Sequence, residues 1–222
     1  MNKKVKTTEL FSLIPEHLQK LFSESQYPWE ILPKIHEYTK ELIATGIDGY
    51  RLYAEGVLVG EGVKIYPTAT IEPPTIIGKN TEVRPGAFIR GNVIIGDGCV
   101  IGNSTELKNC VILDKAQVPH YNYVGDSVLG YHAHMGAGAI CSNLKANGTS
   151  VVIHGDEEYE TGLRKIGAIL GDNADVGCGS VLNPGTVIGT NTQVYPLTSV
   201  RGVIPENAIV KTLENIVIKN SP

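Results

Sequence analysis

The stretch from Ile71 to Gly102 reads IEPPTIIGKNTEVRPGAFIRGNVIIGDGCVIG and carries an aliphatic residue at every sixth position. A small or β-branched residue stands four positions after most of them, as Thr75, Thr81 and Ala87 do. If both recurrent positions point inward, three hexads close one triangular coil, and the chain climbs by about 4.8 Å per coil. The sequence therefore predicts an all-β fold, a parallel β-helix of hexapeptide repeats.

The six-residue period extends in both directions from this stretch. It begins at Val59 and is expected to run without a slip until the segment 119–128, which takes the place of two full hexads. The period resumes at Leu129. Because a strict repeat specifies the fold, its departures are where function is expected. The compressed segment contains His120 and Tyr123.

A second interruption, at about residues 144–165, predicts an inserted loop, after which the period returns from Leu170 to Val200. We expect residues 59–211 to form the β-helix domain, with this insertion, and residues 212–222 to form a C-terminal tail. The acidic middle of the insertion is expected to be a solvated loop tip.

The residues that precede the repeats have a helical pattern. Pro15 can open one helix and Pro28 a second, which Gly46 can end. Two short helices cannot make an independent core, so we expect residues 1–58 to form a helical cap over the open end of the repeat array. A regulatory or partner-docking role is the alternative.

Length, charge and composition limit the kinds of partner and the cellular location that we expect. With 222 residues and a net charge of -4, the chain is one large domain with a small appendage, and its charge argues against nucleic acid or an acidic membrane surface as partner. No signal core and no apolar run of transmembrane length is present, which predicts a cytoplasmic protein. The four cysteines form no CxxC pair and are expected to be buried, reduced thiols. They are Cys99, Cys110, Cys141 and Cys178.

The repeat pattern resembles the hexapeptide-repeat acyltransferases, a resemblance that implies a left-handed parallel β-helix. The stretch from Pro119 to Asn143, PHYNYVGDSVLGYHAHMGAGAICSN, is similar to the acetyltransferase half of a bifunctional family. That family comprises the UDP-N-acetylglucosamine pyrophosphorylase/glucosamine-1-phosphate N-acetyltransferases and their archaeal sugar-phosphate relatives. The matching positions are His120, Tyr123, Gly125, Asp126, Gly136, Ala137, Gly138, Ser142 and Asn143, with Arg90, Thr105, Glu106, Leu107 and Lys108 upstream.

The resemblance implies an acetyl-CoA-dependent N-acetyltransferase of UDP-N-acetylglucosamine biosynthesis, acting on an amino-sugar 1-phosphate. His120 would be the general base that takes a proton from the amine as it attacks the thioester. Asn143 would orient the site or the acyl donor. Arg90, Lys108 and Tyr123 would hold the sugar phosphate, and Glu106 is a further candidate for binding the substrate.

The resemblance implies further site residues, one of which departs from the family's pattern. His134 stands where the family has an Asn that contacts the sugar, which is a departure, and Lys165 would contact sugar phosphate or CoA phosphate. Backbone N–H groups of the turn at residues 136–138 are candidates for stabilising the oxyanion. The acyl donor CoA would lie along later coils beside Ala137, Cys178, Pro196 and Lys211.

Repeat spacing tests the phosphate site independently. Arg90 and Lys108 are separated by one full coil of three hexads, so they should stack on one outer edge about 4.8 Å apart, where a phosphate would neutralise both. The alternative is a solvated edge with Glu106 as the partner. The same count puts His120 on another edge. Either the register break moves His120 across, or a neighbouring subunit completes the site, and we predict a homotrimer.

Several alternatives stay open at this point. The segment 1–58 that precedes the repeats is too short for the family's nucleotidyltransferase domain, so a pyrophosphorylase activity is not expected. No spacing supplies three converging histidines for zinc, and we expect no metal. An O-acyltransferase, an acyltransferase for another amine, and a non-catalytic subunit that binds a sugar nucleotide or a partner protein are the rival functions.

Overall fold

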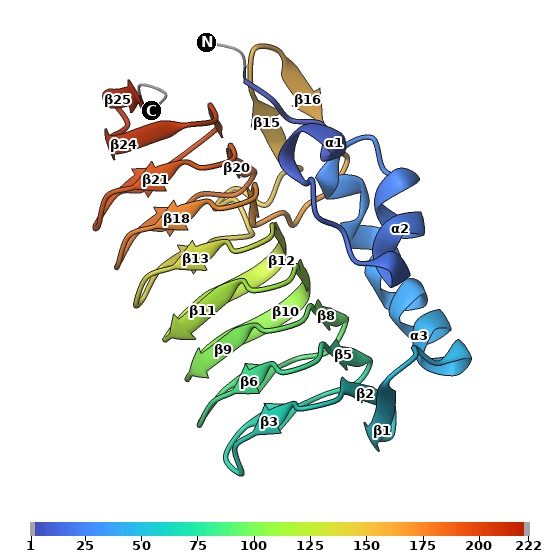
Figure 1. The fold of residues 1–222 in the computed structure, drawn as a ribbon. Coiled ribbons are helices and arrows are strands. Elements are labelled where there is room, and N and C mark those ends of the chain that lie inside the picture. Colours follow the sequence, from blue (N-terminus) through green and yellow to red (C-terminus); the bar gives the residue numbers. More distant parts are fainter. Residues whose placement is uncertain (1–2, 220–222) are drawn as a thin grey trace.

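Inward-pointing aliphatic residues coil the chain into a parallel β-helix with three faces, whose strands stack in register along the molecule (Figure 1). The computed structural model describes residues 3–219. Its parallel stacking is consistent with the left-handed β-helix expected from the resemblance.

Face 1 is a stack of strands whose last member pairs with an antiparallel strand at the end of the helix. These strands are β3 (Lys64–Ile65), β6 (Glu82–Val83), β9 (Val100–Asn103), β11 (Gln117–His120), β13 (His134–Met135), β18 (Asp175–Val176), β21 (Gln193–Val194), β24 (Ala208–Thr212) and the antiparallel β25 (Asn215–Ile218).

Faces 2 and 3 share two long strands, β10 (Glu106–Ile112) and β12 (Tyr123–Leu129), which run through the corner between them. Face 2 also contains β4 (Thr70–Ile71), β7 (Phe88–Ile89), β14 (Ile140–Cys141), β19 (Val181–Leu182) and β22 (Ser199–Val200). Face 3 contains β2 (Val57–Gly60), β5 (Thr75–Ile77), β8 (Val93–Ile95), β17 (Ala168–Leu170), β20 (Thr186–Ile188) and β23 (Val203–Ile204), with β1 (Tyr50–Ala54) antiparallel to β2 at its end.

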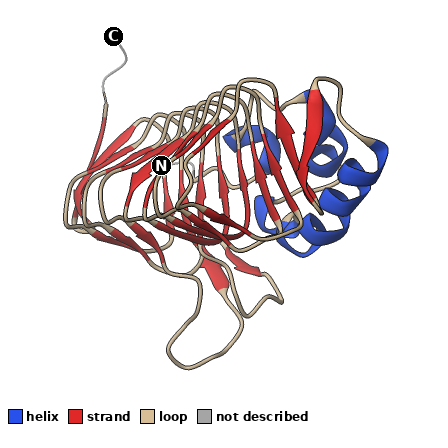
Figure 2. Cartoon of the chain, turned by 90° about the horizontal axis from the view of Figure 1, so that it is seen from below, coloured by secondary structure: helices blue, strands red, loops and turns tan. Residues whose placement is uncertain are grey.

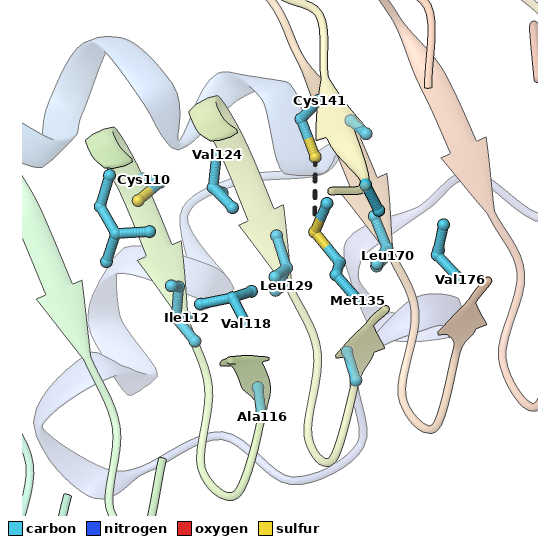
Figure 3. Close-up of a cluster of buried hydrophobic side chains, with 14 of the residues drawn as sticks. Cys110, Ile112, Ala116, Val118, Val124, Leu129, Met135, Cys141, Leu170 and Val176 are labelled. Atoms are coloured by element: carbon cyan, nitrogen blue, oxygen red, sulfur yellow. Dashed lines mark hydrogen bonds between the residues drawn. The ribbon is translucent and has the colours of Figure 1, made fainter. Parts of the chain in front are cut away.

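The register break is not where the hexad count placed it. After Leu107 the inward residues are Ile112, Val118, Val124 and Leu129, which line the core together (Figure 3). The repeat therefore loses one residue twice, between 107 and 112 and between 124 and 129, instead of two residues within 119–128. Strand pairing on face 1 agrees, because Val83 lies beside Ile101 and Ile101 beside Val118, so the second coil is one residue shorter than the first.

The physical cause is a pair of tight corners between faces 2 and 3. Asn109 and Asp126 take the left-handed conformation, with φ of 49° and 48°, and each turns the chain with one residue fewer than the preceding corner. Leu113, which the count placed inward, packs instead in an outer apolar cluster. Both shortened corners point their polar side chains to the same edge of the molecule.

The N-terminal helices cover the side of the β-helix and not its open end, which corrects the expected cap (Figures 1 and 2). They lie on face 3, where an outer row of aliphatic residues such as Ile76, Ile94 and Val111 is buried against Leu21 and Ile35. Burying each such side chain contributes about 1.5–3 kcal/mol, which explains the lateral packing. The elements are α1 (Thr7–Leu10), η1 (Glu16–Leu18), α2 (Gln19–Ser23), η2 (Pro28–Glu30), η3 (Leu32–Lys34) and α3 (Ile35–Thr45).

The predicted insertion is present and is closed at its base by a bridge between Leu144 and Lys165. It contains a hairpin of β15 (Val152–His154) and β16 (Glu158–Glu160), whose tip is exposed as expected. Tyr159 of this hairpin packs on Tyr27 and Trp29 of the N-terminal segment. Within residues 3–219, none of the helices has both the length and the apolar character needed to cross a bilayer.

Candidate functional site

A buried carboxylate is the centre of a polar cluster at the corner between faces 2 and 3. Asp126 is only 4% exposed, and its oxygens accept from Lys108 Nζ at 3.0 Å, from Asn109 Nδ2 at 3.0 Å and from Asn143 Nδ2 at 2.6 Å. A buried charge is tolerated when it is paired and hydrogen-bonded in this way. The two shortened corners supply Asn109 and Asp126, so the register breaks build the cluster.

Asn143 and Tyr123 extend this cluster across face 2. Nδ2 of Asn143 also donates to the Tyr123 hydroxyl at 3.1 Å, so both amide hydrogens are engaged and Oδ1 is left as an acceptor. Gly125 makes room for this arrangement, since a Cβ there would clash with the Tyr123 hydroxyl. Burial, followed by the charges of Asp126 and Glu106, raises the pKa of Tyr123, which keeps the hydroxyl neutral.

Arg90 and Lys108 lie side by side, as their spacing predicted. The Arg90 N–H donates to the carbonyl of Leu107 at 2.8 Å, which puts the two cations on neighbouring strands. Each has its own carboxylate, however. Arg90 Nη1 lies 2.7 Å from Glu106 Oε1, the partner that the alternative interpretation named, and Lys108 pairs with Asp126.

His120 ends β11 at the corner between faces 1 and 2, with its side chain exposed. Its backbone N–H donates to Oδ1 of the buried Asn122 at 3.1 Å, and Asn122 Nδ2 donates to the carbonyl of Gly136 at 2.8 Å, which fixes the corner. Within residues 3–219 the imidazole itself has no hydrogen-bond partner. As the spacing predicted, His120 and Lys108 lie on different edges, and the register break does not bring them together.

Four of the predicted site residues occupy the same position on successive coils, and we call them the edge file: His120, Ala137, Cys178 and Pro196. Hydrogen bonds between neighbouring coils establish the file. The Gly138 N–H, which follows Ala137, donates to the His120 carbonyl at 2.9 Å, and the Gly179 N–H, which follows Cys178, donates to the Ala137 carbonyl at 2.8 Å. The Leu197 N–H, which follows Pro196, donates to the Cys178 carbonyl at 2.9 Å. At about 4.8 Å per coil the file is roughly 14 Å long. Lys211 lies at the far end, in β24.

The edge file contains the chain's exposed thiol. Cys178 is exposed, which corrects the expectation that all four cysteines are buried, because it lies in a corner turn between Gly177 and Gly179. The other three are buried in the core as expected. Burial raises the pKa of Cys99 and of Cys141 to about 12, so these thiols are unreactive.

Two other predicted residues lie apart from the edge file. His134 is on face 1, where its Nδ1 lies 2.8 Å from Asp175 Oδ1, away from the Asp126 cluster. Lys165 stands at the base of the insertion and lines, with Arg164 and Asn109, an open hollow of about 540 Å³ that also borders Asp126. The structure thus brings Lys165 to the cluster but leaves His134 on another face of the same chain.

Several known proteins resemble this chain in sequence. A family described as "GMPPB C-terminal domain" matches residues 71–158. The "Bifunctional protein GlmU" of Methanococcus aeolicus is 33% identical over 195 residues, which are 86% of this chain and 47% of that protein. The chain resembles the hexapeptide-repeat half of GlmU. The predicted resemblance is confirmed.

A second relative is the "Bifunctional sugar-1-phosphate nucleotidylyltransferase/acetyltransferase" of Sulfurisphaera tokodaii, 35% identical over 43% of this chain and 24% of that protein. The chain spans about half the length, 47%, of the GlmU protein from M. aeolicus. Among solved structures, the "Acetyltransferase domain of PglB from Neisseria gonorrhoeae FA1090 in complex with acetyl coenzyme A" covers 82% of this chain and 64% of that chain, at 16% identity and a TM-score of 0.35.

Asn109 was missed as a site residue, and Asp126 was noticed only as part of the GlmU-like motif. A signal was available, because both are short polar residues of the kind that tolerates a positive φ. In the part of the chain that the structure describes, no group of three or more His, Cys, Asp or Glu side chains is arranged to hold a metal ion.

Proposed function

We propose that the chain is an acetyl-CoA-dependent N-acetyltransferase that acts on an amino-sugar 1-phosphate of the glucosamine-1-phosphate type. The observation that carries the proposal is the edge file. It ends in an exposed imidazole with no partner among residues 3–219, and it offers an extended donor an open path along three further coils. The similarity to GlmU over 86% of the chain supports the same activity.

His120 acts as the general base in this proposal. The amine nitrogen attacks the thioester carbonyl, His120 takes the amine proton, and the C–S bond breaks to release the thiol of CoA, which receives a proton in turn. A neutral imidazole is suited to this step near neutral pH. Direct attack requires no covalent acyl-enzyme, so the protein's contribution is positioning and stabilisation of the oxyanion.

The Ala137 N–H is the donor that we assign to the oxyanion. In the turn at residues 136–138, the Gly136 N–H donates to Val176 at 2.7 Å and the Gly138 N–H donates to His120 at 2.9 Å. Within the described residues the Ala137 N–H has no acceptor, and it lies one coil from His120. Cys178, Pro196 and Lys211 then line the path of the CoA chain, with Lys211 toward its phosphates.

The sugar phosphate occupies the cationic side of face 2. The Arg90–Glu106 pair is well exposed and therefore weak, so a phosphate can replace Glu106 as the partner of Arg90. Lys108 is held by Asp126, and Tyr123 presents a neutral hydroxyl. Asn143 Oδ1, which has no hydrogen-bond donor among residues 3–219, accepts a hydrogen bond from the sugar or the acyl donor.

The distance between base and phosphate site supports assembly from more than one copy. Asn122, beside His120, and Gly125, beside Lys108, are three residues apart, or roughly 10 Å at about 3.3 Å per residue. In glucosamine-1-phosphate the amine and the phosphate are on neighbouring carbons. A homotrimer in which the edge file of one copy faces the phosphate side of the next would close this gap.

Release of free thiol from acetyl-CoA in the presence of glucosamine-1-phosphate tests the proposal. We expect turnover by the wild type and a fall of about 100-fold or more in His120→Ala, the usual contribution of general base catalysis. His36→Ala, a change on α3, is the matched control and should keep full activity. Turnover that His120→Ala leaves intact would refute the mechanism, and absence of turnover with every amino sugar would favour a non-catalytic binding subunit.

A further inference from the structure

Two open hollows meet beside the insertion. The first, of about 540 Å³, borders Asp126 and contains Arg164 and Lys165. The second, of about 520 Å³, lies between the N-terminal segment and the insertion hairpin. Both are lined by Pro33 and Leu163, so they adjoin, and we call them together the insertion groove. The groove starts at the polar cluster around Asp126 and leads away from it.

The end of the groove near Asp126 is basic. Arg164 Nε donates to the carbonyl of Gly148 at 3.2 Å, and in the described part of the chain neither Arg164 nor Lys165 forms an ion pair with a carboxylate. Asp126, on the same hollow, is already neutralised by Lys108. Two neighbouring cations without counter-charges favour an anion with several oxygens, such as a phosphate or a diphosphate.

The far end of the groove is aromatic with an acidic rim. Tyr27 and Trp29 stack with ring centres 4.7 Å apart and planes within 4°, and Tyr159 packs edge-on against Tyr27 at 5.3 Å. Both tyrosines are partly exposed. Four carboxylates border the same hollow, those of Glu30, Glu157, Glu158 and Glu160.

The opposite charges of the two ends orient a ligand. Aromatic side chains offer a flat surface on which a base can stack, a contact that is typical of nucleotide recognition by proteins. Carboxylates at the rim accept N–H donors from a base and repel phosphates, while Arg164 and Lys165 attract phosphates to the other end. A ligand with a base at one end and phosphates at the other matches both ends, and a simple sugar phosphate reaches only one of them.

We propose that the insertion groove binds the nucleotide part of a nucleoside-diphosphate-linked amino sugar, which extends the proposed acceptor class from an amino-sugar 1-phosphate to its nucleotide-linked form. The inference rests on the proposed function, because the sugar is then the group acetylated on face 2. The diphosphate leaves the sugar at the carbon that carries phosphate in a sugar 1-phosphate, passes Lys165 and Arg164, and places the base beside Tyr27 and Tyr159.

The chain's single tryptophan, Trp29, provides a binding assay that needs no turnover. Trp29 fluorescence of the 222-residue chain is titrated with ADP, CDP, GDP and UDP in the absence of acetyl-CoA. We expect saturable change with at least one of them. Tyr159→Ala and the double variant Arg164→Ala/Lys165→Ala should each weaken that binding by about ten-fold or more, since stacking and charge-assisted contacts are each worth that much. Tyr195→Ala and Arg84→Ala, on face 1 and away from the groove, are matched controls and should leave it unchanged.

Three results would overturn the inference. The first is the absence of a saturable change in Trp29 fluorescence with any of the nucleotides. The second is an affinity for inorganic pyrophosphate equal to that for all four nucleotides. The third is a change in fluorescence with spermidine and with none of the nucleotides. The assay is separate from acetyl transfer. Acetyl transfer to glucosamine-1-phosphate without nucleotide binding would contradict only the inference about the groove. Nucleotide binding without acetyl transfer to any amino sugar would contradict the proposed activity.

Discussion

Asn143 donates its side-chain amide to the carboxylate of Asp126 over 2.6 Å. A carboxylate only accepts, so this contact dictates which way the amide faces and leaves Oδ1 of Asn143 turned away from Asp126. Lys108 and Asn109 donate to the same carboxylate. Asp126 therefore positions three polar side chains at once, although it is too buried to serve as a surface contact for a ligand.

Replacing Asp126 by Asn should destabilise the protein and weaken acetyl transfer together. The change removes the charge that Lys108 faces and allows the amide of Asn143 to turn, so we expect a loss of about 3 kcal/mol in the free energy of unfolding. Urea denaturation measures it. Asp175→Asn is the matched control, because Asp175 pairs with His134 at 2.8 Å but is half exposed, and it should cost under about 1 kcal/mol. Equal losses in the two variants would contradict a special role for Asp126.

The hexad period predicted the coils, the insertion and the separation of His120 from Lys108, because inward positions in a closed coil must be aliphatic. It misplaced the register break because neighbouring residues are equally apolar. Leu113, six residues after Leu107, is as apolar as Ile112, which is the residue that points inward. A six-residue count from Leu107 therefore meets an aliphatic residue in either register. What distinguishes the two registers is the positive φ at the shortened corners, and that depends on how successive coils stack.

The position of the helices was missed for a similar reason. Face 3 carries two consecutive aliphatic residues in coil after coil, as at Ile76–Ile77 and Ile94–Ile95, which indicates a strand buried on both sides. The expectation of an end cap ignored this signal. Even so, the packing of Trp29 on Tyr159, which belongs to a distant part of the sequence, depends on tertiary contacts that no local pattern contains.

Cys178 should be the thiol of the native protein that N-ethylmaleimide modifies. Buried Cys99 and Cys141, whose pKa values rise to about 12, stay protonated and inaccessible. If the acyl donor follows the edge file, saturating acetyl-CoA should slow the modification by about ten-fold or more, because a bound ligand removes the accessible state. Mass spectrometry measures the rate, with Cys178→Ser as the unreactive control. Modification at an unchanged rate would show that the donor binds elsewhere.

Assembly of the site between copies is testable by mixing two inactive variants. His120→Ala and Lys108→Ala each remove one side of the proposed site. In randomly mixed trimers about a quarter of the inter-copy sites combine an intact His120 from one copy with an intact Lys108 from the next. We therefore expect co-expression to restore about a quarter of wild-type thiol release. Activity no higher than that of the separate variants would mean that each chain uses its own His120 and Lys108.

His17 makes the packing of the N-terminal segment sensitive to pH. Its Nε2 is buried without a hydrogen-bond partner among the described residues, and its ring lies 6.1 Å from that of Tyr50, near Asp97, Asp114 and Lys79. Burial lowers the pKa of His17 below its ordinary value of 6.5, although Asp97 and Asp114 oppose the shift. The unfolded chain thus binds the proton more readily than the folded one.

Stability should therefore fall as the pH drops below 6.5 toward the lowered pKa of His17, and be fully present above 6.5. His17→Gln, neutral at every pH, should flatten the slope of unfolding free energy between about pH 5 and pH 7, measured by urea denaturation. Asp114 acts with the opposite sign, because burial raises the pKa of its carboxyl above 3.8 and its protonation stabilises the folded state. Asp114→Asn removes that opposing contribution and should steepen the loss of stability as the pH falls toward 3.8. A slope that His17→Gln leaves unchanged would show that other groups control the acid sensitivity.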